Sequence, residues 1–266
     1  MTIFLAAVDD SAACRPLLLV ALRVGELVGA QVIAVHVQQD GSGETARATA
    51  EDLNVPLLVR SGETIEEICA ARRELHAVAI VVGARSFPGG ASPAGHNTLR
   101  IAEATAVPLI IVPPDASDER MERILIALGR NGDAEIVLAL AEQLRLADDP
   151  DIVAVHVFRP DAIPPYGDDP TFEAEVWAHE FLRRATATAI KHVHIELRVG
   201  DPAVEVSAAV HELGADLVVL AWHHAISGGH APIVRRVLET AHVPVVLLDA
   251  NSVDAPVGAS PERGSG

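Results

Sequence analysis

The residues best suited to chemistry lie in two loops of the first half of the chain. Asp9 follows a continuous apolar run, residues 3–8, that is typical of a buried strand. A loop rich in glycine, proline and serine spans residues 83–95, and Asn97 and Thr98 stand where the next helix is expected to begin. Glycine lets backbone N–H groups approach phosphate oxygens, and a helix N-terminus adds a partial positive charge. The pattern therefore suits an anion site beside Asp9, and it suits equally a helix-capping turn at Asp9 next to a surface loop.

Alternating strands and helices must position these loops. Short apolar runs predict strands at 3–8, 31–37, 56–60, 78–82 and 109–112, with helical patterns between them. Such alternation indicates a parallel sheet with right-handed crossovers. Ligands bind such sheets beyond the carboxyl ends of the strands, where the strand order switches direction. The loop after the first strand and the loop after the fourth are therefore expected to form one site.

The chain contains an internal repeat. Residues 4–9 recur as 124–129, and three other landmarks recur in the same order: residues 35–37 as 155–157, 60–62 as 198–200, and 79–83 as 217–221. A fifth, residues 107–112, recurs as 243–248. Five landmarks in one order indicate a duplicated unit. We expect an α/β fold of two tandem, five-stranded, mostly parallel sheets flanked by helices, with domains at 1–114 and 119–250 and a disordered tail at 251–266.

These residues resemble the universal stress protein family in its tandem two-domain form. The resemblance rests on Val8-Asp9-Asp10-Ser11, on the His-Val end of the second strand, on the glycine after the fourth strand, and on the Val-Pro-hydrophobic last strand. It covers nearly all of residues 2–250. It implies a Rossmann-like fold related to the adenine nucleotide α-hydrolases and a non-catalytic role in the stress response. It also implies that the last strand of each unit pairs across an interface. One expectation is that the chain imitates a family dimer by itself, and a homodimer through edge strands is a further one.

The family's ATP-binding members carry Gly-x-x-Gly, nine further residues, and then Gly followed by Ser or Thr. Here Ser86 stands in place of the second glycine, and the interval from Gly83 to Gly95 is 12 residues (95 − 83), one fewer than the pattern requires. Adenine-nucleotide binding in this half is therefore expected to be weak, partial or lost. If ATP binds, with accompanying Mg²⁺, the resemblance assigns it to Asp9, Val37 through its backbone, Gly83, Ser86, Gly95, Asn97 and Thr98.

The second half departs further from the pattern. Gly129 replaces the aspartate, and residues 221–224 (Ala-Trp-His-His) replace Gly-x-x-Gly. Trp222 is expected to fill the vacated pocket or to pack between the halves rather than to stack on a ligand. His36 and His156 recur at equivalent strand ends, which favours a structural role. The remaining histidines lack converging carboxylates or thiolates at suitable spacing, so no metal site is expected.

Composition excludes several classes of protein. The net charge of −17 argues against nucleic-acid binding, which needs clustered Lys and Arg. The apolar runs are shorter than the roughly 20 residues that a membrane span needs. Two cysteines in separate apolar helical patterns predict reduced thiols and a cytoplasmic protein.

Two other functions stay open beside the stress-response module. One is a nucleotide-hydrolysing enzyme of the same fold, although the chain has no Ser-Gly-Gly-x-Asp-Ser loop and no Walker motif. The other is an interaction protein that binds an unknown protein partner and no nucleotide. The aromatic- and proline-containing insertion at 159–180 suits either a partner-binding arm or a flexible loop.

Overall fold

The computed structural model describes residues 2–38, 43–84, 96–105, 107–116, 121–128, 150–159, 193–222 and 232–249. The first half contains β1 (Thr2–Val8), α1 (Cys14–Val28), β2 (Ala30–Gln38), α2 (Glu44–Asp52), β3 (Leu57–Ser61), α3 (Thr64–Leu75), β4 (Ala79–Gly83), α4 (His96–Ala104) and β5 (Leu109–Val112). The second half contains β6 (Arg123–Leu128), β7 (Asp151–Phe158), β8 (Val193–Val199), α7 (Pro202–Glu212), β9 (Leu217–Trp222), α8 (Pro232–Thr240) and β10 (Val245–Asp249). Most of the insertion and the whole of the tail at 251–266 lie outside the described residues.

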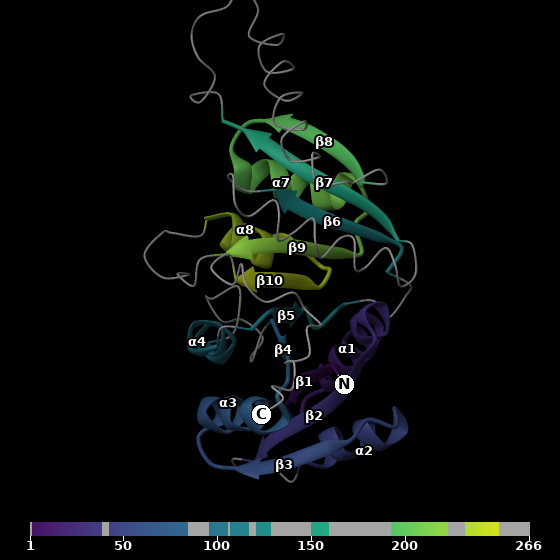
Figure 1. The fold of residues 1–266 in the computed structure, drawn as a ribbon, viewed down its shortest axis with the longest axis vertical. Helices are drawn as coiled ribbons and strands as arrows, with labels where there is room; N and C mark the ends of the chain where they lie inside the picture. The colour runs from purple at the N-terminus through teal and green to yellow at the C-terminus, as the bar shows by residue number, and fades with distance from the viewer. Residues whose placement is uncertain are drawn as a thin grey trace, which may run out of the picture.

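All of the described strands belong to one sheet, in the order β3-β2-β1-β4-β5-β10-β9-β6-β7-β8 (Figure 1). The order of the first half recurs in the second, read outward from the middle of the sheet. Pairs within each half are parallel, and β5 and β10 pair antiparallel, with Ile110 opposite Val246. The predicted α/β class with a mostly parallel sheet is confirmed, but the two predicted sheets are joined into one.

The central pairing agrees with the expectation that one chain imitates a family dimer. The last strand of each half pairs across an interface, and that interface lies between β5 and β10 of the same chain. Their backbone hydrogen-bonding groups are therefore not available to a second chain. The outer edges of the sheet are β3 and β8, and a homodimer through edge strands stays a prediction that could involve only those two.

Apolar side chains alternate between the two faces of the sheet, as the period of two in a strand requires. Phe4, Ala6 and Val8 of β1 pack on one face with α1, whereas Leu5 packs on the other face with residues of α3 and α4. In the second half α7 and α8 lie on the same face as α3 and α4. The core is built from Val, Ile, Leu and Ala, because both faces of a parallel sheet are covered.

The turn from the third strand into the next helix is built alike in both halves. Glu63 caps α3 by accepting hydrogen bonds from the N–H groups of Ile65 and Glu66. Asp201 caps α7 in the same way, by accepting hydrogen bonds from the N–H groups of Ala203 at 2.9 Å and Val204 at 3.2 Å. The glycine before each cap has a positive φ, 146° at Gly62 and 157° at Gly200. These equivalent turns explain why Arg-x-Gly recurs in the sequence.

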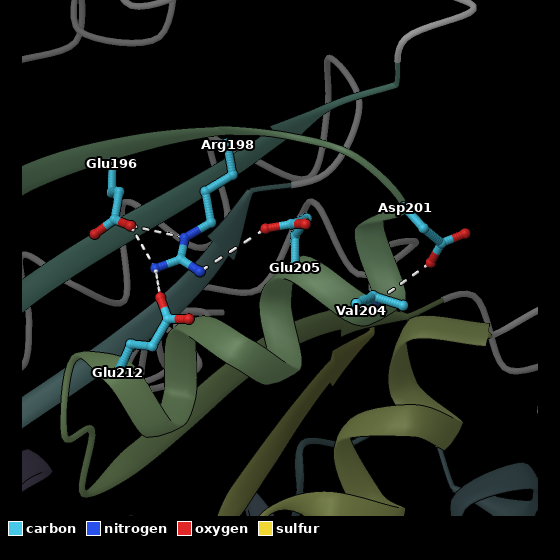
Figure 2. A network of polar contacts seen from close by, with 6 residues as sticks. All are labelled: Glu196, Arg198, Asp201, Val204, Glu205 and Glu212. Carbon is cyan, nitrogen blue, oxygen red and sulfur yellow. Dashed lines mark hydrogen bonds and ion pairs between the residues drawn. The ribbon is translucent and has the colours of Figure 1, made fainter.

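Figure 2 shows how an arginine ties β8 to α7. The Arg198 guanidinium contacts Glu196 at 2.6 Å and Glu212 at 2.7 Å, and it lies 3.8 Å from Glu205. Burial alone would lower the pKa of Arg198, but its hydrogen bonds and charge attraction to Glu196 and Glu212 raise it overall. In the first half Arg60 of β3 pairs with Glu74 of α3. Both arginines therefore fasten an outer strand to the helix that follows it.

Candidate functional site

The structure places three of the predicted site residues at one edge of the sheet. Asp9 directly follows β1, Val37 is the penultimate residue of β2, and Gly83 is the last residue of β4. β1 pairs in parallel with β2 on one side and with β4 on the other. The carboxyl ends of all three strands therefore lie next to one another, where the strand order switches direction.

Asp9 shapes the turn that leaves β1. Its Oδ1 atom accepts hydrogen bonds from the Ser11 N–H at 3.1 Å and from the Ser11 hydroxyl at 2.6 Å. The Ser11 hydroxyl oxygen in turn accepts from the Ala13 N–H. The carboxylate is exposed, and its second oxygen makes none of these bonds. Asp9 is thus a turn residue that still offers one carboxylate oxygen at the strand end.

Asp10 makes a contact that the sequence did not reveal. Its Oδ1 atom accepts hydrogen bonds from the N–H groups of Thr45 at 2.6 Å and Ala46 at 3.3 Å, in the first turn of α2. Burial alone would raise the pKa of Asp10, but the hydrogen bonds from Ala46 and Thr45 and the nearby His36 lower it overall. Asp10 therefore fastens the loop after β1 to the N-terminus of α2, across 35 residues of chain.

His36 supports the same edge from below. Its Nδ1 atom lies 3.1 Å from the Val8 carbonyl oxygen, and its side chain is buried. A Cβ atom on Gly43, which has a φ of +66°, would lie 2.9 Å from the imidazole ring. Glycine is therefore required at the entry to α2 on two counts, backbone conformation and space.

The histidine contact recurs in the second half. His156 Nδ1 lies 3.2 Å from the Leu128 carbonyl oxygen, at an offset of 120 residues from the first-half pair (156 − 36 and 128 − 8). Burial lowers the pKa of His156, which the hydrogen bond to Leu128 partly opposes. The predicted structural role of both histidines is confirmed, because each ties the second strand of its half to the end of the first.

Thr98 and Gly83 form the other side of the candidate site. The Thr98 hydroxyl donates a hydrogen bond of 2.7 Å to the Gly83 carbonyl oxygen, and the residue is only 5 % exposed. This bond joins the first turn of α4 to the end of β4. The hydroxyl proton is therefore already used within the chain, although the oxygen can still accept a bond.

Gly83 has room for a side chain. A Cβ atom built on it would have Leu17 Cδ1 as its nearest described neighbour, at 4.0 Å, and its φ is not in the left-handed region. Nothing in the described part of the chain therefore requires glycine there. Space directly above a strand end is what a phosphate group needs in order to approach backbone N–H groups.

The other predicted ligand-binding residues are not all described. Ser86 and Gly95 lie outside the described residues. Asn97 lies in the first turn of α4, and its side chain is not among those described. The geometry of the site therefore rests on Asp9, Val37, Gly83 and Thr98.

In the second half the described residues at this edge build core. Trp222, the last residue of β9, is 3 % exposed and packs in the apolar cluster that includes α7 and α8. This agrees with the expectation that Trp222 packs rather than stacks on a ligand. Gly129 and residues 223–224 lie outside the described part of the chain. Within the described part, no group of three or more His, Cys, Asp or Glu side chains could hold a metal ion.

Residues 121–249 match the model of the Universal stress protein family. This half of the chain belongs to the universal stress protein family. The matched region runs from just before β6 to the end of β10. No curated protein matches the chain, so the comparison of whole proteins comes from solved structures.

Solved structures show the same fold over nearly the whole chain. A universal stress protein from Archaeoglobus fulgidus DSM 4304 has a TM-score of 0.66 at 17 % identity, covering 94 % of this chain and 98 % of that one. A putative universal stress protein from Pseudomonas aeruginosa UCBPP-PA14 has a TM-score of 0.64 at 14 % identity, covering 93 % and 92 %. The cytoplasmic domain of a prokaryotic cation chloride cotransporter has a TM-score of 0.58 at 12 % identity, covering 94 % and 96 %. At these identities the likeness establishes the fold alone.

Among the described residues, no helix is both long enough and apolar enough to cross a membrane.

Proposed function

We propose that the chain is a tandem universal stress protein that works without catalysis and binds adenine nucleotide weakly, in its first half. The observation that carries the proposal is the meeting of Asp9, Val37 and Gly83 at adjacent carboxyl ends of β1, β2 and β4. These are the positions at which the family resemblance expects the nucleoside and the phosphates.

The geometry suggests a role for each of these residues. The open side of Gly83 would admit phosphate close to the backbone, next to the N-terminus of α4. The unused oxygen of Asp9 would accept a hydrogen bond from a ribose hydroxyl. The backbone of Val37, one residue from the end of β2, would face the base. ATP bound there would carry Mg²⁺ on its own phosphates.

Internal hydrogen bonds at two of these residues, Thr98 and Asp9, argue for weak rather than tight binding. The Thr98 hydroxyl proton is held by the Gly83 carbonyl, so the threonine cannot donate to phosphate without breaking that bond. Asp9 already accepts two bonds from Ser11. A ligand must break the Thr98 bond to gain its hydroxyl proton, and at Asp9 it finds only the second carboxylate oxygen, while a net hydrogen bond is worth only about 0.5–1.5 kcal/mol. We further propose a cytoplasmic location, in line with the reduced-thiol composition.

The same two internal contacts favour a second candidate, an interaction protein that binds no nucleotide. In that case Thr98 and Asp9 simply close the edge of the sheet, and the output of the protein depends on a protein partner. The two candidates differ in the expected effect of a side chain at position 83, because a side chain there would obstruct a bound phosphate but would contact little else in the described part of the chain.

Titration calorimetry of the full chain with MgATP, on the wild type and on Gly83→Ala, separates them. We expect measurable binding to the wild type, at least a tenfold loss of affinity in Gly83→Ala, and equal melting temperatures without ligand, since Ala fits the space. Ala221→Ser, at the equivalent position of the second half, is the control and should bind like the wild type. If the wild type does not bind ATP at millimolar concentration, the remaining candidate is the interaction protein that binds no nucleotide. Turnover of ATP above background that is lost in Gly83→Ala would instead indicate an enzyme.

A further inference from the structure

An apolar cavity lies over the middle of the sheet, where the two halves join. Its lining includes Ile110 of β5 and Val246 of β10, which are opposite one another in the antiparallel pair. Val24 and Val28 of α1 line it from the first half, and Val219 and Leu248 line it from the second. Every described residue that lines the cavity is apolar. The cavity therefore bridges the two halves, and its described lining offers no polar side chain to a ligand.

The internal repeat shows where the space comes from. Ala79 and Leu217 begin the equivalent strands β4 and β9, and both line the cavity. Where β9 begins with leucine, β4 therefore begins with alanine, which has only a methyl group. Ala79 is 3 % exposed, so the space left by its smaller side chain lies inside the protein and not at its surface.

The cavity lies away from the candidate nucleotide site. Val28, Val78 and Pro108 are its half-buried lining residues, whereas the others are buried. Val78 and Pro108 precede β4 and β5, at the amino ends of these strands. Asp9 and Gly83 stand at the carboxyl ends. A molecule in the cavity would therefore not compete directly with a nucleotide.

The size of the cavity limits what can occupy it. Its volume of about 40 Å³ is roughly three times the 10–15 Å³ that a single water molecule requires. Water has no hydrogen-bond partner among the described lining side chains, so an apolar group is favoured over water in this space. A charged or polar group would lose its hydration without compensation. The net charge of −17 also works against an anionic amphiphile.

We infer that this cavity is a binding site for the short alkyl group of an uncharged molecule, which bridges the two halves when bound. Because the lining comes from α1, β4 and β5 on one side and from β9 and β10 on the other, occupancy strengthens the junction between β5 and β10. A ligand that binds the folded chain alone raises its melting temperature.

The test uses xenon as an apolar probe of the full chain. We expect a saturable ¹²⁹Xe NMR shift with the wild type, which Ala79→Leu abolishes by introducing the residue that the second half carries at the equivalent position. Ile80→Val is the matched control, because Ile80 is the next residue of β4 but packs on the opposite face of the sheet. It should keep the shift. A wild-type shift that rises linearly without saturation, or one that Ala79→Leu retains, would overturn the proposal.

A second measurement keeps the proposal testable if Ala79→Leu does not fold. Xenon-pressurised crystals of the wild type should show an anomalous peak above Ile110 and Val246, and crystals without a peak there would contradict the site. Charge selectivity is tested by melting the wild type with 1-propanol and with propanoate, whose alkyl groups are short. We expect a saturable rise in melting temperature with the alcohol alone. Equal responses to both probes would overturn the preference for an uncharged ligand.

Discussion

Arg198 of β8 and Glu212 of α7 form an ion pair of 2.7 Å. Arg60 of β3 and Glu74 of α3 form the equivalent pair in the first half, and in both pairs the two residues are fourteen positions apart in the chain. The two sites differ in their surroundings. Arg198 also contacts Glu196 and lies near Glu205, and its side chain is 12 % exposed. Arg60 is 27 % exposed and pairs with Glu74, which is 57 % exposed.

This difference predicts unequal effects of removing the arginines. Arg198→Met should lower the free energy of unfolding by about 1.5–3 kcal/mol, the range for hydrogen bonds to charged groups, because three carboxylates lose their shared cation. Arg60→Met should cost less than about 1 kcal/mol, as for other solvent-exposed pairs. Urea unfolding of both variants measures the two values. Equal losses would show that the additional glutamates do not matter.

His76 predicts a stabilising substitution. It ends α3 in the left-handed conformation, with a φ of +51°, and it is exposed. Gly214 has a φ of +61° at the equivalent position after α7. His76→Gly should raise the free energy of unfolding by about 0.5–1 kcal/mol, because glycine adopts this conformation without steric strain. Gly214→Ala is the reciprocal variant and should destabilise. Thermal unfolding of both provides the check, and a loss of stability in His76→Gly would contradict the argument.

Asp10 predicts a dependence of stability on acid pH. Its pKa in the folded chain is lower than its ordinary value, because the ionised carboxylate accepts hydrogen bonds from α2. Its contribution is therefore fully present above the pKa of the unfolded chain and disappears as pH falls through the lower, folded value. The stability difference between the wild type and Asp10→Asn should shrink as pH falls below about 4. Urea midpoints measured at pH 7 and at successively lower pH follow it, and a pH-independent difference would rule out this role.

The two cysteines should differ in reactivity. Burial raises the pKa of the Cys14 thiol to about 11, and the residue is 1 % exposed. Burial also raises the pKa of Cys69, which is less deeply buried. Since the thiolate is the reactive form, Cys69 should react first with iodoacetamide at pH 8, and Cys14 should react only when urea unfolds the chain. Peptide mass mapping assigns the labelled residue, and rapid labelling of Cys14 in the folded chain would contradict its burial.

The proposed contact of Asp9 with the ribose predicts that removing its carboxylate lowers nucleotide affinity, whereas removing a carboxylate elsewhere does not. Asp9→Ala should weaken MgATP binding by about 1–3 kcal/mol, the cost of losing one polar partner. Glu26→Ala removes a carboxylate of the same charge near the C-terminal end of α1, where Glu26 pairs with Arg23. It should leave the affinity unchanged. Calorimetry compares the two variants, and equal affinities in Asp9→Ala and the wild type would exclude the proposed contact.

Much of the fold could be predicted from the sequence, because apolar runs and their spacing are local signals. The predicted strand at 109–112 coincides with β5, and the predicted strand at 31–37 lies within β2. The joining of two sheets into one could not be derived from residue patterns, since β5 and β10 are separated by more than 130 residues and their pairing depends on the tertiary fold. The alternation of strands and helices nevertheless predicted that the strand ends before Asp9 and at Gly83 lie close together.

The chemistry within the site was less accessible to sequence reasoning. Asp10 reads as part of a turn, and its contact with Thr45 arises only when α2 packs beside β1. Thr98 reads as a hydroxyl available to an anion, but the fold directs its proton to the Gly83 carbonyl. Both contacts depend on the relative position of separate elements, which the spacing of residues along the chain does not encode.

We propose that adenine nucleotide binds at the carboxyl ends of β1, β2 and β4. The decisive experiment is a crystal structure of the full chain grown with saturating MgATP. We expect electron density for the nucleotide in the first half alone, with the base beside the Val37 backbone, the ribose near Asp9 and the phosphates above Gly83. Nucleotide density at the equivalent edge of the second half, or none at the first, would exclude the proposed site.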